Sequence, residues 1–188
     1  MNKRLLISYF ENFGQRSINA SKEVVIDFLK NNSLNIDIDS KELKVSWIEI
    51  VNEIDKIKNS DFDWFVLCGE ASTYQDVTIE VHADNICKGI DKYGVEGISD
   101  NPYEEFFTSL DIEKLKIDNV NISYNAGSYL CNRSYFLSLK KFRNKKVLFI
   151  HFPLIKEEGG NKEKTELSYI LERIIERIDI DDGIKNCC

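Results

Sequence analysis

A cysteine at the expected start of a helix is the first residue of this sequence that could do chemistry. Cys131 follows the segment NISYNAGS, which reads as a strand and a glycine turn, and lies in the first turn of the next helix. There the helix dipole and the free backbone N–H groups favour the thiolate, which is the nucleophilic form, and the same N–H groups can bind an oxyanion. Free cysteines are also often buried structural residues, so this position alone leaves both interpretations open.

A histidine near the end of an apolar strand is a candidate partner for this cysteine. His151 interrupts the strand KVLFIHFPL, and a buried imidazole needs a polar partner. Acting as a general base toward a cysteine is one such role. A hydrogen-bonded core histidine without a role in chemistry is the alternative.

The segment VTIEVHADNI holds the second histidine and two carboxylates. In an extended strand, Thr78, Glu80, His82 and Asp84 share one face. Glu80 has the chemistry to orient a histidine, as the third member of a catalytic triad does. The alternatives are a solvated strand face and a divalent-cation site built from Glu80, His82 and Asp84.

The elements that must position these residues alternate between strands and helices, with glycine, asparagine and serine at the turns. Expected strands cover residues 4–9, 34–45 (a strand or a hairpin), 63–69, 76–86, 120–126 and 146–154, and expected helices cover 21–32, 47–59, 106–118, 129–142 and 163–178. This order predicts the α/β class, as a single-domain, three-layer α/β/α sandwich with a mixed, mostly parallel twisted sheet. Ligands of such sheets bind beyond the carboxyl ends of the strands.

The composition argues against several classes of protein. A hydrophobic content of 43% and a charged content of 30% fit a soluble globular chain. The formal net charge of −7, from 32 acidic and 25 basic residues, argues against a nucleic-acid-binding surface, and no apolar run is long enough to span a membrane. The apolar part of MNKRLLISYF is too short for a secretory signal and Glu11 interrupts it, so we expect a first strand in a protein that stays in the cytoplasm.

The cysteines indicate neither a disulfide framework nor a zinc site. The chain has five of them, an odd number, and no CxxC spacing. Cys187 and Cys188 end the chain, in what we expect to be a flexible tail over residues 179–188.

Two of these motifs resemble those of a known enzyme family. NAGSYLCN and FIHFP, with Cys131 and His151, are similar to the cysteine and histidine motifs of the pyroglutamyl peptidase I family, also called pyrrolidone-carboxylate peptidases. Weaker similarities cover nearly the whole chain in the same order. LISYFENFGQRSINAS resembles the family's opening, FVLCGEASTYQDVTIEVHADNI its glycine loop and catalytic glutamate, and FFTSLDIEKL its Y-F-S-T-L-P helix.

The resemblance implies a function and catalytic roles. Residues 1–188 would form one pyroglutamyl-peptidase-like domain that removes N-terminal pyroglutamate from peptides through a thioester. Cys131 would be the nucleophile, His151 the general base and acid, and Glu80 the carboxylate that orients the histidine. The resemblance implies no metal or organic cofactor, and it implies a homo-oligomer of two or four subunits.

The resemblance also implies a substrate pocket. Phe10 and Phe13 would enclose the flat pyroglutamyl ring, and Glu70 would contact it through its backbone. The ring N–H and C=O need such partners, because burying them unpaired costs about 1–3 kcal/mol each.

This sequence departs from the family's pattern in the substrate loops. Tyr9 stands where the family has glycine, residues 71–75 read ASTYQ in place of a Gly-Arg-Ser loop, and Val81 replaces an arginine. A second arginine of the family has no clear equivalent here. Lys88 or Lys92 could replace its charge, but a lysine cannot make the two parallel hydrogen bonds of an arginine. Two other functions therefore stay open: a cysteine hydrolase of the same fold with a different acyl or amide substrate, and a catalytically weak relative that binds peptides or a protein partner.

Overall fold

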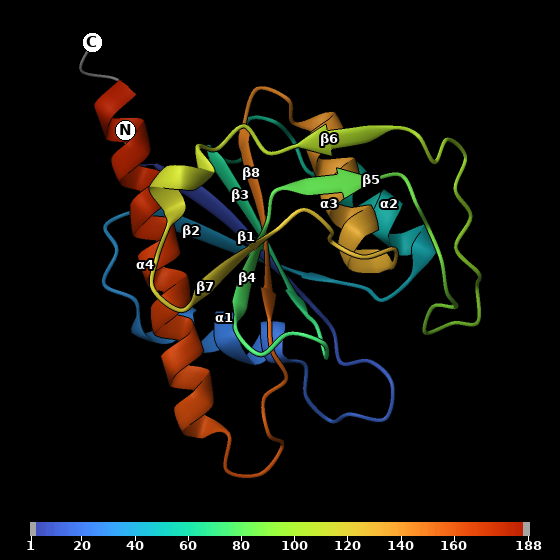
Figure 1. Cartoon of the computed structure of the whole chain (residues 1–188), viewed down its shortest axis with the longest axis horizontal. Coiled ribbons are helices and arrows are strands. Elements are labelled where there is room, and N and C mark those ends of the chain that lie inside the picture. The colour runs from blue at the N-terminus through green and yellow to red at the C-terminus, as the bar shows by residue number, and fades with distance from the viewer. Residues whose placement is uncertain (1–2, 186–188) are drawn as a thin grey trace.

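A six-stranded sheet is the frame of the structure, a computed structural model that describes residues 3–185, with side chains up to residue 178. The strands lie in the order β2-β1-β3-β8-β4-β7 (Figure 1). Their bounds are β1 Arg4–Phe10, β2 Asp37–Leu43, β3 Trp64–Glu70, β4 Val77–Glu80, β7 Val120–Ser123 and β8 Lys146–Phe152. Every pairing is parallel except that of β4 with β8, which is antiparallel. The expected mixed, mostly parallel sheet is confirmed.

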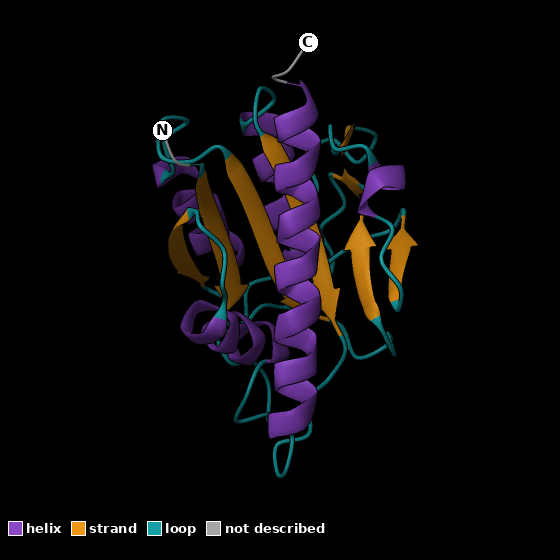
Figure 2. Cartoon of the chain, turned by 90° about the vertical axis from the view of Figure 1, so that its left-hand side faces the viewer, coloured by secondary structure: helices purple, strands orange, loops and turns teal. Residues whose placement is uncertain are grey.

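Helices cover both faces of this sheet and complete the three layers. Helices α1 (Ala20–Asn31) and α4 (Asn161–Lys185) share one buried apolar cluster, and α4 runs along the sheet in Figure 2. Helices α2 (Trp47–Lys56) and α3 (Leu130–Lys141) share a second cluster on the other face. None of the helices in the described residues is both long and apolar enough to cross a membrane.

The central strands explain why the sheet can be covered on both sides. β3 and β8 read WFVLCGE and KVLFIHF, and nearly all of their residues are buried. Such continuous apolar runs are typical of strands with helices on both faces. Alternate residues point to opposite faces, so Phe149 belongs to the α2–α3 cluster and Ile150 to the α1–α4 cluster.

The single strand expected over residues 76–86 is wrong, because the chain leaves the sheet at Val81. β4 ends at Glu80, and β5 (His82–Asp84) pairs with β6 (Glu105–Phe107) in a separate two-stranded ribbon. The Val81 N–H donates to the Ser123 carbonyl at 2.9 Å, and the Val81 carbonyl accepts from Thr108 N–H at 3.0 Å. Glu80 and His82 therefore lie in different sheets.

The helix expected over residues 106–118 is also wrong. The first residues of this segment belong to strand β6, and only a short 3₁₀ helix, η1 (Ile112–Leu115), follows. The apolar residues of this segment pack on different surfaces: the Phe106 ring lies 5.4 Å from that of Phe136 on α3, whereas Leu115 joins the α1–α4 cluster. Tertiary contacts therefore decide the conformation here.

Other elements differ from the expected ones in smaller ways. Residues 34–45 hold one strand, β2, which pairs with β1 in parallel and does not form a hairpin. Helix α1 begins at Ala20 behind the N-cap Asn19, whose side chain accepts from Ser21 N–H. Helix α4 continues to Lys185, past the expected end at residue 178, and the remainder of the expected tail, with Cys187 and Cys188, lies outside the described residues.

The packing of α4 yields a stability prediction. Ile174 is fully buried in the α1–α4 cluster, so Ile174→Ala should lower the free energy of unfolding by about 2–5 kcal/mol. Tyr169 on the same helix is 61% exposed, and Tyr169→Ala should change it by less than about 0.5 kcal/mol. Urea unfolding curves of both variants check this, and equal effects would contradict the docking of α4.

Candidate active site

The antiparallel pairing of β4 with β8 brings a carboxylate to a histidine. Thr78 lies opposite His151 and Glu80 opposite Phe149, so Glu80 and His151 are diagonal neighbours on one face. The Nδ1 atom of His151 donates to Oε1 of Glu80 at 2.8 Å, and both residues are buried. This contact fixes the imidazole and leaves its Nε2 for a second partner.

The cysteine is supplied by a helix and not by the sheet, because Cys131 lies in the first turn of α3. The half-buried Cys131 thiol lies close enough to His151 to interact with its imidazole, so Cys131, His151 and Glu80 form one line of interacting side chains. Gly69 on β3 lies directly beneath the thiol: a methyl group built there would stand 2.9 Å from Sγ of Cys131 and 2.8 Å from Cζ of Phe149. The structure thus brings together the three residues that the sequence singled out.

The electrostatics of this line favour a charged histidine. Burial alone lowers the pKa of His151, but hydrogen bonds and charge interactions with Cys131 and Glu80 outweigh it and raise that pKa to about 9. An imidazolium beside a thiol stabilises the thiolate. By contrast, burial raises the pKa of both Cys68 and Cys87.

The N-terminus of α3 has free hydrogen-bond donors near the thiol. The N-cap residue, Tyr129, makes no side-chain cap hydrogen bond. Because the N–H groups of the first turn have no partner within the helix, they are available to an anion held near Cys131.

The two phenylalanines expected around a substrate ring lie in different surroundings. Phe10, at the end of β1, is 4% exposed and belongs to the α2–α3 cluster. Phe13 is 40% exposed, and its ring lies 5.8 Å from that of Tyr129, which in turn lies 5.4 Å from the ring of Trp47. Phe13 therefore packs at the edge of an aromatic cluster with the partly buried Tyr129 and the buried Trp47, two residues that sequence reasoning did not identify for the site.

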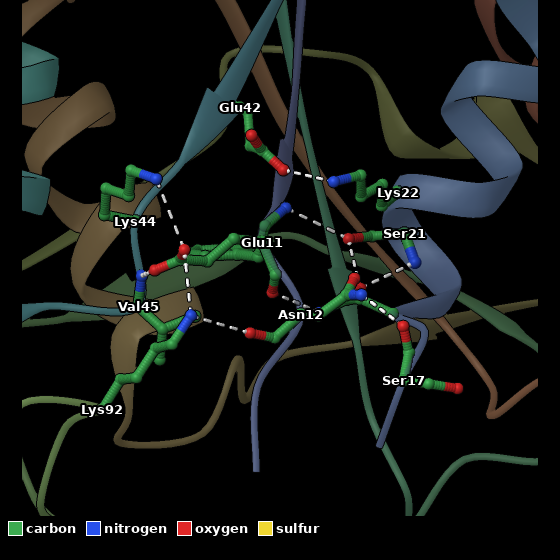
Figure 3. A network of polar contacts seen from close by, with 11 residues as sticks. Glu11, Asn12, Ser17, Ser21, Lys22, Glu42, Lys44, Val45 and Lys92 are labelled. Atoms are coloured by element: carbon green, nitrogen blue, oxygen red, sulfur yellow. Dashed lines mark hydrogen bonds and ion pairs between the residues drawn. The ribbon is translucent and has the colours of Figure 1, made fainter. Parts of the chain in front are cut away.

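A buried carboxylate anchors the loop that carries Phe13 (Figure 3). Glu11 accepts from Val45 N–H at 3.1 Å and pairs with the ammonium groups of Lys92 at 3.1 Å and Lys44 at 3.4 Å. Lys92 also donates to the Asn12 carbonyl. The charge of Lys92, considered from the sequence as a substitute for a missing arginine, is thus engaged by Glu11.

The side chain of Glu70 has a structural partner of its own. Its Oε2 accepts from Ala20 N–H at 2.6 Å, at the start of α1, and its Oε1 lies 3.8 Å from Nε of Arg16. These contacts fix the end of β3 beside the first loop. The backbone contact to substrate expected for Glu70 stays a prediction.

The alternative metal site is not assembled. His82 contacts the Tyr124 carbonyl at 3.1 Å and Glu105 at 2.8 Å, while Asp84 accepts from Asn132, and Glu80 is engaged by His151. No group of three or more suitable ligands occurs within the described residues. The break of the strand at Val81 explains why the shared face inferred from the sequence does not exist.

Tyrosines complete the surroundings of Glu80. The Tyr74 hydroxyl donates to Glu80 Oε1 at 3.0 Å, and the Tyr135 hydroxyl donates to the Glu80 carbonyl at 2.9 Å. Sequence reasoning missed both. Tyr135 is one turn beyond Cys131 on α3, a spacing that could have suggested it, whereas Tyr74 lies in a loop without periodicity.

An α/β sandwich in which a cysteine, a histidine and a carboxylate form one line has the site architecture of a cysteine hydrolase. Residues 3–185 match the family described as pyroglutamyl peptidase, and the chain belongs to this family.

Relatives with this family's names align over most of their lengths. The pyrrolidone-carboxylate peptidase of Fusobacterium nucleatum is 29% identical, over 98% of this chain and 95% of that protein. Pyrrolidone-carboxylate peptidase 2 of Caldanaerobacter subterraneus is 31% identical, over 86% of each chain.

Solved structures share the fold. Pyrrolidone carboxyl peptidase from Thermococcus litoralis superposes with a TM-score of 0.82 at 24% identity, over 98% of this chain and 96% of that one. Pyroglutamyl peptidase I of Bacillus amyloliquefaciens gives 0.78 at 19% identity, over 92% and 94%.

The Glu11 network yields a prediction with a defined pH dependence. Burial by itself raises the pKa of Glu11, but the Val45 N–H and the two lysines more than offset it, so that pKa is lowered. A carboxyl group whose pKa is lower in the folded than in the unfolded state stabilises the fold at pH values above its unfolded-state pKa. This stabilisation is lost as the pH falls through the folded-state pKa. Glu11→Gln should therefore lower the free energy of unfolding at pH 7 by about 1.5–3 kcal/mol, and by less as the pH falls below about 4.

A matched control lies nearby, in the same view (Figure 3). Glu42 pairs with Lys22 at 2.7 Å but is more exposed than Glu11, so Glu42→Gln should cost less than about 1 kcal/mol at pH 7. Urea unfolding at several pH values measures both variants. A Glu11→Gln effect that stays constant down to pH 3 would contradict the role of the carboxylate charge.

Proposed function

We propose that this protein removes pyroglutamate from the N-terminus of peptides, with Cys131 as nucleophile, His151 as general base and acid, and Glu80 as the orienting carboxylate. The observation that carries the proposal is the line from Cys131 through His151 to Glu80, with a hydrogen bond of 2.8 Å between His151 and Glu80, in a chain that belongs to the pyroglutamyl peptidase family. The cytoplasmic location and the homo-oligomer inferred from the sequence stay predictions.

The first half of the cycle forms a thioester. In the resting enzyme His151 holds the Cys131 proton at Nε2, since Nδ1 is bonded to Glu80, and Cys131 is a thiolate. The thiolate then attacks the carbonyl carbon of the pyroglutamyl residue, and the oxyanion takes hydrogen bonds from backbone N–H groups in the first turn of α3. When the intermediate collapses, the C–N bond breaks, and the leaving amine receives the proton from His151.

The second half regenerates the enzyme. His151, now neutral, takes a proton from a water molecule whose oxygen attacks the thioester carbonyl. The C–S bond breaks, pyroglutamic acid leaves, and the thiolate and imidazolium are restored. Glu80 orients His151 throughout and fixes which ring nitrogen faces Cys131.

The lactam ring is recognised by the first loop and the end of β3. Phe13 supplies an aromatic face, Phe10 supports the loop from the core, and the backbone of Glu70 pairs with the polar edge of the ring. The exposure of Phe13 supports this proposal, because an aromatic face that is 40% exposed can pack against a small flat ring.

The direct test is hydrolysis of pyroglutamyl-7-amino-4-methylcoumarin under reducing conditions. Wild type should turn over, and Cys131→Ala should reduce kcat/KM by more than about 10³-fold, because the nucleophile is lost. Cys87→Ala is the matched control and should retain activity, since that buried cysteine lies outside the line.

A negative result would be equally informative. If wild type is inactive but Cys131 reacts with iodoacetamide much faster than Cys68, the site serves a different acyl or amide substrate. If Cys131 reacts no faster than Cys68, the chain is a catalytically weak relative, and the proposal is wrong.

The raised pKa of His151 predicts the alkaline limit of activity. Because the folded-state pKa is about 9, His151 keeps the proton for the leaving amine at neutral pH and loses it as pH rises through that value. A plot of kcat/KM against pH should therefore fall with a midpoint near pH 9. His82→Gln should leave the midpoint unchanged, whereas a wild-type midpoint near 6.5 would show that Glu80 and Cys131 do not hold the imidazolium.

A further inference from the structure

Tyr74 lies beside the catalytic line without having been assigned a role in it. It belongs to the loop between β3 and β4, and its hydroxyl donates to Oε1 of Glu80 at 3.0 Å. Its ring also contacts the His151 ring edge-on, with centroids 5.6 Å apart. Tyr74 therefore contacts two members of the line at once.

The carboxylate of Glu80 has few hydrogen-bond donors besides Tyr74. The residue is fully buried, and Oε1 accepts from both His151 and Tyr74. Its second oxygen, Oε2, is buried and has no hydrogen-bond partner in the part of the chain that the structure describes. A buried carboxylate is costly unless donors compensate the lost water, so the Tyr74 hydroxyl is one of two side-chain donors on which this charge depends.

The hydrogen bond from Tyr74 to Glu80 is the shortest that the Tyr74 hydroxyl makes. The Tyr74 oxygen lies 3.0 Å from Oε1 of Glu80, 3.3 Å from Oγ of Ser123 and 3.5 Å from the Asn125 carbonyl. Oγ of Ser123 in turn accepts from Asn125 N–H at 3.1 Å and donates to the Asn125 carbonyl at 3.4 Å. The turn that precedes Cys131 is thereby connected to the carboxylate that holds His151.

Tyr74 remains protonated across the working pH range. Burial is the main cause that raises the pKa of Tyr74, and the nearby charge of Glu80 adds to it against the lowering effect of Ser123. The hydroxyl is thus a permanent donor.

We propose that Tyr74 is a positioning residue for the peptidase reaction, because its hydroxyl holds the buried Glu80 carboxylate in the orientation in which it accepts from Nδ1 of His151. This inference rests on the proposed function for its effect on turnover. Without the hydroxyl, the buried carboxylate has one side-chain donor left and holds the His151 imidazole less firmly. An imidazolium that is held less firmly stabilises the Cys131 thiolate less.

The variant Tyr74→Phe isolates the hydroxyl, because the ring that contacts His151 remains. We expect kcat to fall about tenfold, the effect of losing one hydrogen bond to a charged group, while KM changes less than about twofold. Tyr124→Phe is the matched control: Tyr124 is a nearby tyrosine that is 68% exposed, and its variant should behave as wild type.

A double-mutant cycle tests whether Tyr74 acts through Glu80. In a Glu80→Ala background, adding Tyr74→Phe should change the remaining activity by less than about twofold, because its target is gone. An unchanged tenfold loss in that background would overturn the proposal, as would a single variant as active as wild type.

Alkylation of Cys131 separates this proposal from the proposed function. The rate of reaction with iodoacetamide, followed by peptide mass spectrometry against pH, reports the thiolate without any need for turnover. Tyr74→Phe should slow alkylation of Cys131 several-fold at pH 7. In the plot of alkylation rate against pH, the midpoint of the rise on the acid side should move to higher pH. If wild type hydrolyses no pyroglutamyl substrate but this shift occurs, the proposed function fails and the role of Tyr74 stands. If Tyr74→Phe is alkylated at the same rates as wild type at every pH, the proposed role of Tyr74 is wrong.

Discussion

The hydrogen bond between Glu80 and His151 is the interaction on which the rest of the site depends. It exists because one short strand, β4, runs against the direction of its neighbour β8, so that the two side chains become diagonal neighbours. A parallel β4 would place a different end of the strand beside His151. The antiparallel pairing is therefore a functional feature of an otherwise parallel sheet, and it also determines where α3 must deliver Cys131.

The substrate side of the site is organised by separate contacts. Glu11 ties the first loop to two lysines, and Glu70 ties the end of β3 to the start of α1. Neither carboxylate faces the thiol, yet both determine where the proposed ring pocket lies. The loops can thus differ from the usual pattern of the family while Cys131, His151 and Glu80 keep their geometry.

Much of the fold could be predicted from the sequence, because apolar periodicity and turn residues reveal strands and helices. The class, the order of the main elements and the mixed sheet are confirmed, and the three proposed catalytic residues do lie together. Errors arose where tertiary contacts decide: no local pattern shows that Val81 ends β4, or that Phe106 packs on α3 rather than within a helix. Tyr74 could not be identified from the sequence for a related reason. Its proposed role follows from the conformation of a loop and not from a regular spacing of residues.

The wide separation of Glu80, Cys131 and His151 along the chain also has a consequence for synthesis. β8 is the last strand, and β4 can pair with it only after residue 152 has been made. Until then a newly made chain carries Cys131 as an ordinary thiol, because neither the imidazole nor the carboxylate is in place. The proposed nucleophile therefore gains both of its partners only when the sheet is complete, so the proposed chemistry depends on contacts between segments far apart in the chain.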